Sequence, residues 1–384
     1  MRVRLAPVWE RSALPSQHHF RGLDPLAHPD RALAGGYWVK WIGGASNQDL
    51  GALEDLAGIY TLAGVHCLDL AADAAVVSAA RRGIAWARER GAAQPWLMVS
   101  LSDGDDPHFR KAWFDPARCP ADCPRPCERV CPALAIGSSG GVIASRCYGC
   151  GRCLPACPLD RIEERAQIVE GALVPALLAQ LQPDAVEIHT QAGRGEAFRK
   201  RLAEVHRSGV PLRRLAVSCG LERGAGVFSG TGGAGESPPP VPLGPEPLAA
   251  ELWQRHAALR ACGFRPLWQL DGRPMSGDVG DGTAHAAVRL LEDLTPLAPP
   301  GPLQLAGGTN GSTLPRLEAL GRRLGRRRAG AAGVAFGSVA RRLLQPLLLE
   351  AASRQRPLLG EGDLWPQALT LADALVRPWL PPAP

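Results

Sequence analysis

The sequence predicts an α/β fold, a TIM-like (β/α)8 barrel interrupted after its third strand by a cysteine-rich insertion. Apolar, strand-like runs alternate with segments of helical period, and there are eight such units, the number that closes a barrel. Several runs end in glycine, yet no G-x-G-x-x-G sequence directly follows any of them, which disfavours a dinucleotide-binding sheet. An open parallel α/β sheet beside a separate cysteine-rich domain is the alternative.

The expected strands are short, apolar and partly β-branched, as buried parallel strands are. In the first expected helix, leucines recur on one face, Asn47 or Asp49 can cap the start, and Gly64 ends it. The expected strands are 38–46, 65–73, 95–102, 185–190, 212–220, 265–272, 302–310 and 332–338. The expected helices are 47–64, 73–91, 162–183, 195–209, 247–262, 282–294, 312–325 and 339–353.

The domain organisation follows from these elements. The barrel is discontinuous, because the cysteine-rich stretch interrupts it in the loop after the third strand, at the face where barrel active sites are built. The expected parts are an irregular N-terminal segment (1–36), the barrel (37–116 and 163–356), the insertion (117–162), a flexible Gly/Pro loop (220–247) and a C-terminal tail (357–384).

Composition excludes several classes of function. The net charge is +6, but arginine supplies nearly all of the positive charge and is scattered, apart from runs at 322–323 and 326–328 that fit a solvated helix face. We therefore expect no nucleic-acid binding. No stretch reaches the roughly 20 apolar residues of a membrane span, and no signal peptide is recognisable, so we expect a soluble, cytoplasmic protein. In that compartment, 11 cysteines favour metal ligation over disulfides.

Eight of the cysteines form two groups of four, each closed by Cys-Pro. The second group, with the spacing C-x2-C-x2-C-x3-C-P, is Cys147, Cys150, Cys153 and Cys157. The first, with three residues in every gap, is Cys119, Cys123, Cys127 and Cys131. A helix face carrying the first group is disfavoured, because prolines at 120, 124, 126 and 132 interrupt it. Zinc is a rival for all-cysteine sites, but the C-x2-C-x2-C run fits a cubane better. The wider gaps of the first group leave a three-iron or oxygen-labile cluster open.

The second group resembles the cluster-binding run of bacterial ferredoxins. In two-cluster ferredoxins the cysteine before proline ligates the cluster of the other motif. The resemblance therefore implies a ferredoxin-like insertion with two [4Fe-4S] clusters. One would use Cys147, Cys150, Cys153 and Cys131, and the other Cys119, Cys123, Cys127 and Cys157. An isoleucine five residues after each Cys-Pro cysteine, Ile136 and Ile162, would cover the clusters with apolar surface.

The expected barrel mouth carries weaker signals. The loops after the seventh and eighth strands contain Gly307, Gly308, Thr309, Gly337 and Ser338, where main-chain N–H groups and a helix N-terminus could hold the phosphate of a flavin mononucleotide, FMN. The alternative is that these glycines only end the strands.

Further polar residues follow the expected strands at the same face of the barrel and could line a site. His189 could act as an acid or base near neutral pH, or be a structural histidine. No convincing catalytic set can be assembled from these groups. They are Asn47, Gln48, Asp49, Asp69, Asp73, His189 and Gln191.

Taken as a whole, the chain resembles the LdpA family of cyanobacterial light-dependent period modulators. The resemblance rests on KWIGGASNQDL, YTLAGVHCLDLAAD, the two cysteine motifs, AVEIHTQAGR, LQLAGGTN and GVAFGS, and it covers most of 37–345. It implies an iron–sulfur protein that passes redox state to the circadian clock and associates with clock and clock-input proteins. Two hypotheses remain: a redox sensor without catalytic residues, or an oxidoreductase whose clusters serve a flavin or substrate in the barrel mouth.

Overall fold

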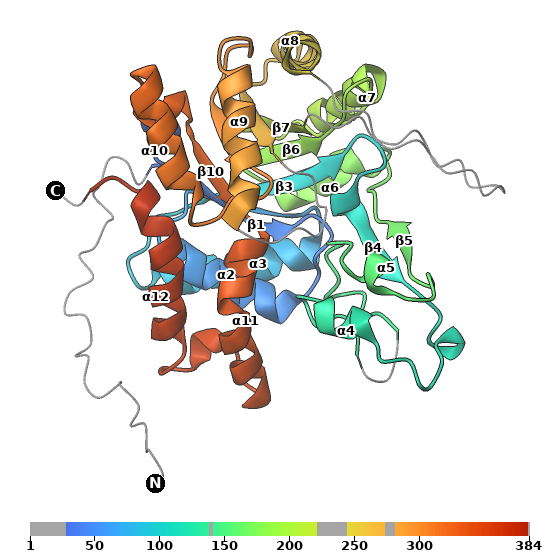
Figure 1. The fold of residues 1–384 in the computed structure, drawn as a ribbon. Helices are drawn as coiled ribbons and strands as arrows, with labels where there is room; N and C mark the ends of the chain where they lie inside the picture. Colours follow the sequence, from blue (N-terminus) through green and yellow to red (C-terminus); the bar gives the residue numbers. More distant parts are fainter. Residues whose placement is uncertain (1–27, 138–140, 221–243, 273–280, 383–384) are drawn as a thin grey trace.

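The computed structural model describes residues 28–137, 141–220, 244–272 and 281–382. Eight parallel strands close into a barrel in the order β1-β10-β9-β8-β7-β6-β3-β2, with the helices packed outside (Figure 1). The predicted barrel is therefore confirmed, and the open sheet is wrong. The strands are β1 Trp38–Gly44, β2 Cys67–Ala71, β3 Trp96–Ser102, β6 Ala185–His189, β7 Arg214–Gly220, β8 Pro266–Asp271, β9 Leu303–Ala306 and β10 Gly333–Phe336.

The helices lie close to the expected ranges, except in 162–183, and α2 and α3 begin at side-chain caps. Asp73, for example, accepts hydrogen bonds from the main-chain N–H groups of Ala75 and Val76 at 2.8 and 3.1 Å, which starts α3. The helices of the barrel are α2 Leu50–Leu62, α3 Ala74–Arg88, α6 Val174–Leu181, α7 Gly195–Arg207, α8 Pro245–Ala261, α9 Ala284–Leu294, α10 Thr313–Leu324 and α11 Ser338–Ser353.

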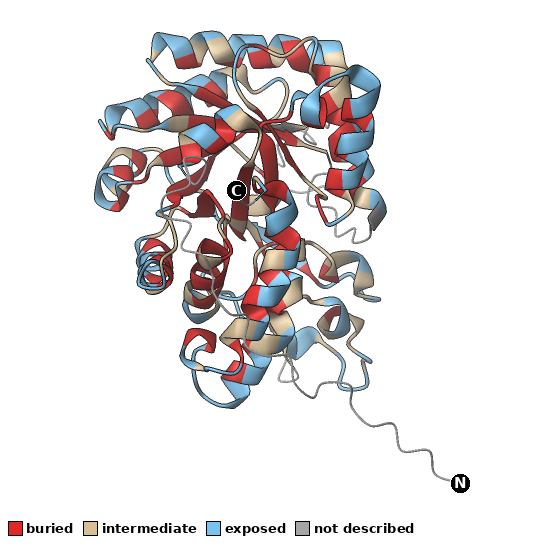
Figure 2. Ribbon diagram, turned by 90° about the vertical axis from the view of Figure 1, so that its left-hand side faces the viewer, coloured by how far each residue is buried: buried red, intermediate tan, exposed pale blue. Residues whose placement is uncertain are grey.

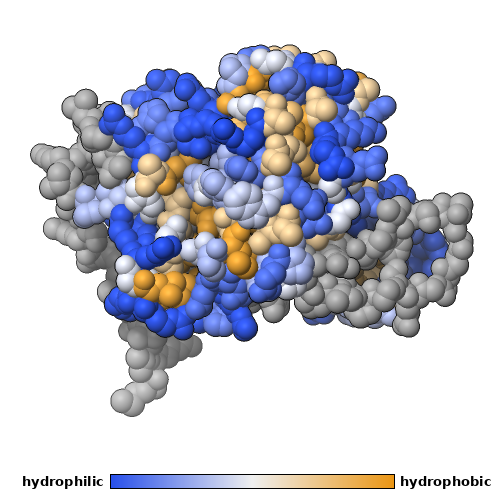
Figure 3. Space-filling model, turned by 90° about the horizontal axis from the view of Figure 1, so that it is seen from above, coloured by the Kyte–Doolittle hydropathy of each residue, from blue (hydrophilic) through white to orange (hydrophobic). Residues whose placement is uncertain are grey.

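The period-2 pattern of each strand divides the core into two regions. In β1, Val39 and Trp41 point outward into the large apolar core between strands and helices, whereas Trp38 and Lys40 belong to the barrel interior. Figure 2 shows the strands buried and the helices buried on the faces toward them. From above, hydrophilic side chains dominate the surface and hydrophobic ones gather in separate small groups (Figure 3).

The barrel interior is layered. Its bottom is an apolar layer that includes Trp38, Trp96, Met98 and Leu267. The side chains of the next layer, nearer the C-terminal ends of the strands, are polar and are also buried. The barrel interior therefore changes from apolar to ionic in this direction. This layer comprises Lys40, Asp69, Glu187, Gln269 and Gln304.

The insertion lies on one side of the barrel, between β3 and β6 (Figure 1). The predicted range 117–162 contains the short helices α4 Pro126–Val130 and α5 Cys153–Ala156. An antiparallel pair of strands, β4 Arg110–Trp113 and β5 Glu163–Ala166, lies on either side of this range in the chain and closes the insertion. The prediction of a largely helical 162–183 is therefore wrong for its first part. Strand β5 pairs with β4 instead, and only α6 is helical.

The two chain ends are more structured than expected. Within the segment predicted to be irregular, α1 Pro29–Gly35 packs beside β1, and residues 1–27 lie outside the described part. The predicted C-terminal tail contains α12 Trp365–Val376, which packs on α2 and α11, so it is part of the barrel wall. Most of the predicted Gly/Pro loop, 221–243, also lies outside the described residues. Among the described helices, none is both long and apolar enough to cross a membrane.

Candidate functional site: a cysteine module beside the barrel mouth

The eight cysteines of the insertion gather in two sets, each drawn from both sequence groups. Cys153 has Cys150, Cys147 and Cys131 as its neighbouring thiols. Cys127 has Cys157 and Cys119 as neighbours, and Cys119 has Cys123 and Cys157. Each Cys-Pro cysteine thus lies with the three cysteines of the other group. All eight are free thiols.

The two Cys-Pro cysteines occupy equivalent local structures. The Sγ of Cys131 accepts a hydrogen bond from Ala135 N at 3.2 Å, and the Sγ of Cys157 accepts one from Arg161 N at 3.4 Å, four residues on in both cases. Leu134 and Asp160, three residues after each cysteine, both have φ of 48°. The insertion is therefore an internal repeat, with main-chain donors directed at sulfur as iron–sulfur sites require.

Apolar side chains surround the thiols. Ile136 and Ile162, 4% and 6% exposed, pack in one cluster with Cys127, Cys147 and Cys153, as the sequence predicts. A small pocket is lined by Cys131, Cys147, Cys150 and Cys153 together with alanines, Ile136 and Val142. Four convergent sulfurs, NH···S hydrogen bonds and an apolar wall form a donor set that fits an iron–sulfur cluster.

The thiols are costly to ionise without a metal. Burial, followed by the neighbouring thiols, raises the pKa of Cys153 to about 12. Burial likewise raises the pKa of Cys150. Since iron binds thiolates, metal binding must release these protons and supply the charge that stabilises the sulfurs.

Gly149, inside the C-x2-C-x2-C run, sets how closely the insertion approaches its own β4 strand. Its φ is 74°, and a Cβ there would lie 2.2 Å from the carbonyl oxygen of Arg110. Two hydrogen bonds join the insertion to Gln48, in the barrel loop after β1. Lys111 Nζ donates to Gln48 Oε1 at 2.6 Å, and Gln48 N donates to Ser145 O at 3.0 Å. The cysteine module is thereby fixed over the loop after β1.

A larger cavity, open to solvent, occupies the barrel mouth at the C-terminal ends of the strands. The module supplies part of its wall through Tyr148, Cys150 and Arg152. The barrel supplies ionisable side chains and glycine-rich loops. The predicted mouth residues Gly307, Gly308, Thr309, Gly337 and Ser338 all line it.

Beneath this cavity lies a buried ion cluster. Lys40 Nζ donates to Asp69 Oδ2 at 2.8 Å and to Glu187 Oε2 at 2.5 Å, and all three side chains are at most 2% exposed. Burial lowers the pKa of Lys40, but the two carboxylates outweigh it and hold that pKa above its usual range. Burial acts to raise the pKa of Glu187, whereas Lys40 and His189 bring it down to about 2. Lys40 is therefore charged, and Glu187 is ionised.

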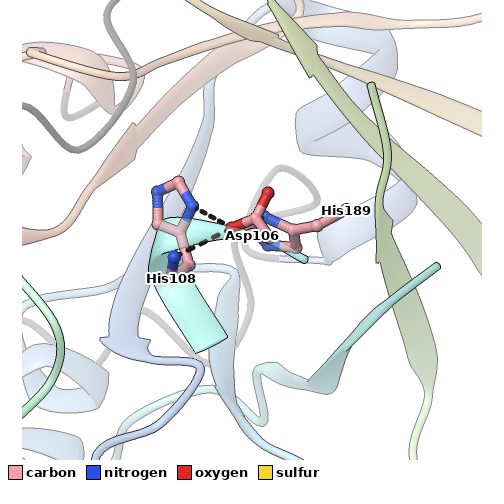
Figure 4. A group of neighbouring side chains, drawn as sticks. All are labelled: Asp106, His108 and His189. Atoms are coloured by element: carbon pink, nitrogen blue, oxygen red, sulfur yellow. Dashed lines mark hydrogen bonds and ion pairs between the residues drawn. The ribbon is translucent and has the colours of Figure 1, made fainter. Parts of the chain in front are cut away.

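His189 joins this cluster to the loop after β3. Its Nε2 lies 3.1 Å from Glu187 Oε1. Burial lowers the pKa of His189, but Glu187 and then Asp106 outweigh this and raise it to about 9. Asp106 and His108 lie beside it (Figure 4). The ligand atoms of these three residues lie within 4.8 Å of one another. Asp106 Oδ1 already accepts two hydrogen bonds from His108, from N at 2.8 Å and Nδ1 at 2.7 Å, which accounts for the grouping without a metal.

Five of the seven polar residues predicted at the strand ends divide into two kinds. Asp69 and His189 line the cavity, whereas Asp49 and Asp73 cap α2 and α3. Gln48 donates to Asp73 at 3.2 Å and so belongs to the caps.

Sequence reasoning missed several cavity residues. They are Lys40, which supports the cavity floor, and Glu187, Asp271, His108 and Arg341, which line it. Two carried a usable signal: a lysine in WVKWI and a glutamate in AVEIH interrupt runs that are otherwise apolar or aromatic.

Comparison with known proteins identifies the insertion and the barrel. Residues 119–168 match a family model described as the LdpA Fe-S cluster-binding domain, and residues 177–378 match the light dependent period A C-terminal domain. An Fe–S cluster-binding domain is therefore present. The chain is 45% identical over 352 residues to "Light dependent period A" of Synechococcus elongatus, which covers 91% of this chain and 93% of the relative.

Solved structures are only distantly similar. Tryptophan synthase of Mycobacterium tuberculosis matches with 10% identity and a TM-score of 0.41, over 92% of this chain and 96% of that chain. (S)-3-O-geranylgeranylglyceryl phosphate synthase of Thermoplasma acidophilum matches with 10% identity and a TM-score of 0.38, over 90% and 98%. Likenesses at these scores carry no argument about function. From the two family models and the curated relative, the chain belongs to the light dependent period A family.

Proposed function

We propose that the protein is an iron–sulfur redox sensor that adjusts the period of the circadian clock to light through partner proteins. The observation that carries the proposal is the convergence of eight thiols in two sets of four, in a chain 45% identical to a protein named for light-dependent period. A redox sensor needs a group that gains and loses electrons at cellular potentials. It also needs a surface whose binding to a partner depends on the oxidation state of that group. Iron–sulfur clusters have that electron-transfer property.

The proposed ligand sets follow the grouping of the thiols. One [4Fe-4S] cluster would be held by Cys131, Cys147, Cys150 and Cys153, and the other by Cys119, Cys123, Cys127 and Cys157. When bound, the clusters supply one-electron chemistry. The chain itself provides the thiolates, the N–H donors to sulfur, and the apolar cover that keeps water from them. These sulfurs are unequal in exposure, since Cys127, Cys147 and Cys153 are buried and the other five are partly exposed.

The proposed partners are clock and clock-input proteins. The module presents exposed apolar side chains near its cysteines, including Val130 at 38%, Leu134 at 39% and Leu159 at 44%. Two of these, Val130 and Leu134, flank Cys131 in the chain. A change of charge at the cysteines would therefore act close to residues that a partner could contact.

A complementation experiment tests this proposal. A Synechococcus elongatus strain that lacks its own light dependent period A would be supplied with this chain, and the period of a clock reporter measured at several light intensities. The proposal predicts that the chain restores the light dependence of the period and that Cys150→Ala does not. Cys262→Ala, outside the module, is the matched control. Restoration by the Cys150→Ala protein at equal abundance would contradict the proposal.

The second candidate, an oxidoreductase with FMN or a substrate in the barrel mouth, is favoured by one observation. The cavity wall contains Cys150, and its floor contains the buried acid–base groups Glu187 and His189. Flavin analysis of protein purified without added flavin separates the candidates, because one FMN per chain favours the oxidoreductase. Absence of flavin together with intact iron favours the sensor.

A further inference from the structure

The barrel mouth contains a buried arginine that forms no ion pair with a carboxylate of the described residues. Arg341, in the first turn of α11, is 6% exposed and lines the large cavity. Within the described part of the chain its guanidinium makes one hydrogen bond, from Nη2 to Gly43 O at 3.3 Å, and no ion pair. A guanidinium has five N–H donors, so most of its hydrogen-bonding capacity is unused. Burying such a group without an anion is costly, which indicates that an anion belongs beside it.

The acids of the same cavity do not serve this purpose. Asp69 and Glu187 are already paired with Lys40, and Glu187 also with His189. Asp271, the third acid, accepts hydrogen bonds from Ser218 and Gln269. The arginines have no such compensation: Arg152, from the module, also lines the cavity, and its Nε is buried without a hydrogen-bond partner among the described residues. At the cavity floor, the acidic and basic side chains are therefore paired with one another. The side where α11 meets the insertion carries the positive charge of Arg341 and Arg152.

Main-chain donors line the same cavity. Within the described ranges, the N–H groups of Gly307, Gly308 and Ser338 donate no hydrogen bond to another main-chain group. Helix α11, of 16 residues, begins at Ser338, which lines the cavity, so the first N–H groups of this helix lie at the cavity edge. Gly308 has φ of 84°, and a Cβ on it would lie 2.9 Å from Cβ of Thr283, so this loop cannot be built from ordinary residues.

We propose that the barrel mouth binds a small phosphorylated molecule, with its phosphate group held by Arg341, Arg152 and the loops at Gly307–Gly308 and Gly337–Ser338. Two guanidinium groups and several main-chain N–H donors match the several oxygens of a phosphate better than the two oxygens of a carboxylate. The loops are those after the seventh and eighth barrel strands, β9 and β10, where barrels commonly hold phosphate. The rest of the ligand would lie toward His189, which ends β6 and provides a hydrogen-bonding group in the same cavity.

Inorganic phosphate is the probe for the test. Full-length protein, purified anaerobically with its metal, is dialysed to equilibrium against radiolabelled phosphate at constant ionic strength. Its iron content is measured in the same sample. The proposal predicts one saturable site per chain and at least about a tenfold weaker affinity in Arg341→Gln. Arg341→Lys keeps the charge but loses the planar fork, so its affinity should be intermediate.

The neighbouring arginine gives the matched control. Arg342 is exposed and does not line the cavity, so Arg342→Gln makes the same change of charge one residue away and should leave binding unchanged. Thermal unfolding provides a second readout, because phosphate should raise the melting temperature of the wild type and Arg342→Gln but not of Arg341→Gln.

Three results would overturn the proposal. They are absence of saturable binding, equal loss in Arg341→Gln and Arg342→Gln, and competition by acetate as strong as that by phosphate. The site is built mainly from the barrel, so its failure is distinct from failure of the iron–sulfur proposal. Protein with iron but no phosphate site refutes only this inference, and protein that binds phosphate without iron refutes only the other.

Discussion

The guanidinium of Arg341 lies 5.2 Å from the ring centroid of Tyr148, and this cation–π contact joins the barrel to the cysteine module. Tyr148 stands next to Cys147 and two residues before Cys150 in the chain. Arg341 is thus in contact with both the barrel cavity and the loop that carries the second cysteine group. A ligand bound in the barrel mouth is therefore in a position to affect the electron affinity of a cluster held by the cysteines.

This contact predicts that phosphate lowers the reduction potential of the protein. A bound anion disfavours the addition of an electron nearby, and by reciprocity the oxidised protein should bind phosphate more tightly. Anaerobic redox titration, followed by visible absorbance with and without phosphate, measures the shift. Chloride at equal ionic strength controls for screening. An identical shift in Arg341→Gln would show that the effect is not local to this site.

Cysteine substitutions test the two ligand sets. Cys131→Ala should damage the same cluster as Cys150→Ala, although the two residues come from different sequence groups. The double variant should then lose no more iron than either single one. Cys131→Ala combined with Cys127→Ala should lose both clusters. Iron content and electron paramagnetic resonance of reduced samples give the measurement, with Cys262→Ala as control. Loss of both clusters in Cys131→Ala combined with Cys150→Ala would mean that the sets are wrong.

His189 predicts how stability depends on pH in the alkaline range. Its pKa in the folded protein is about 9, above the ordinary value of 6.5, because Glu187 and Asp106 outweigh the effect of burial. The stabilisation is fully present below pH 6.5 and is lost as the pH rises through 9, by up to about 3 kcal/mol. Denaturant unfolding across this window should show the loss. His189→Asn should flatten the profile, and His206→Asn, on the exposed face of α7, should not.

Asp55 fixes the C-terminal segment to the barrel. Its carboxylate accepts hydrogen bonds from Leu358 N at 3.0 Å and Leu359 N at 3.1 Å. Asp55→Ala leaves two buried N–H groups without partners, which should cost on the order of 2–3 kcal/mol and increase hydrogen exchange in α12. Asp49→Ala, which removes a carboxylate that only caps α2, should leave exchange in α12 unchanged.

The same residue gives a prediction in the acidic range. Burial raises the pKa of Asp55 to about 6, above the ordinary value of 3.8. For an acid shifted in this direction, stability is greatest below pH 3.8 and falls as the pH rises through 6. Asp55→Asn, which has no charge to gain, should lose this part of the pH profile. A profile unchanged by the substitution would show that Asp55 does not titrate in this window.

Local patterns made most of the fold predictable. All eight barrel strands were expected in their observed places because each is an apolar run bounded by glycine or a helix start. The strands β4 and β5 were not expected, because they carry charged residues (RKAW and EERA) and the four residues of β5 are all exposed. Without an apolar face they show no period of two, and their pairing becomes visible only in three dimensions.

The site was predictable where its residues are close in sequence and unpredictable where the barrel brings distant ones together. The spacing of the cysteines in each group is enough to predict that they bind a metal cluster. Lys40 and Glu187, in contrast, are 147 positions apart, and nothing local pairs them. Asp55 and Leu358 are separated by 303 positions, which is why the C-terminal segment looked like a tail.

The central claim is that the module holds two four-iron clusters, and its most direct test is the metal content of the protein. Anaerobically purified chain should contain about eight iron atoms and a similar number of acid-labile sulfides. It should also show a broad visible absorbance that bleaches on reduction. About four irons would mean that only one set of cysteines is used. Stoichiometric zinc without sulfide would contradict the claim.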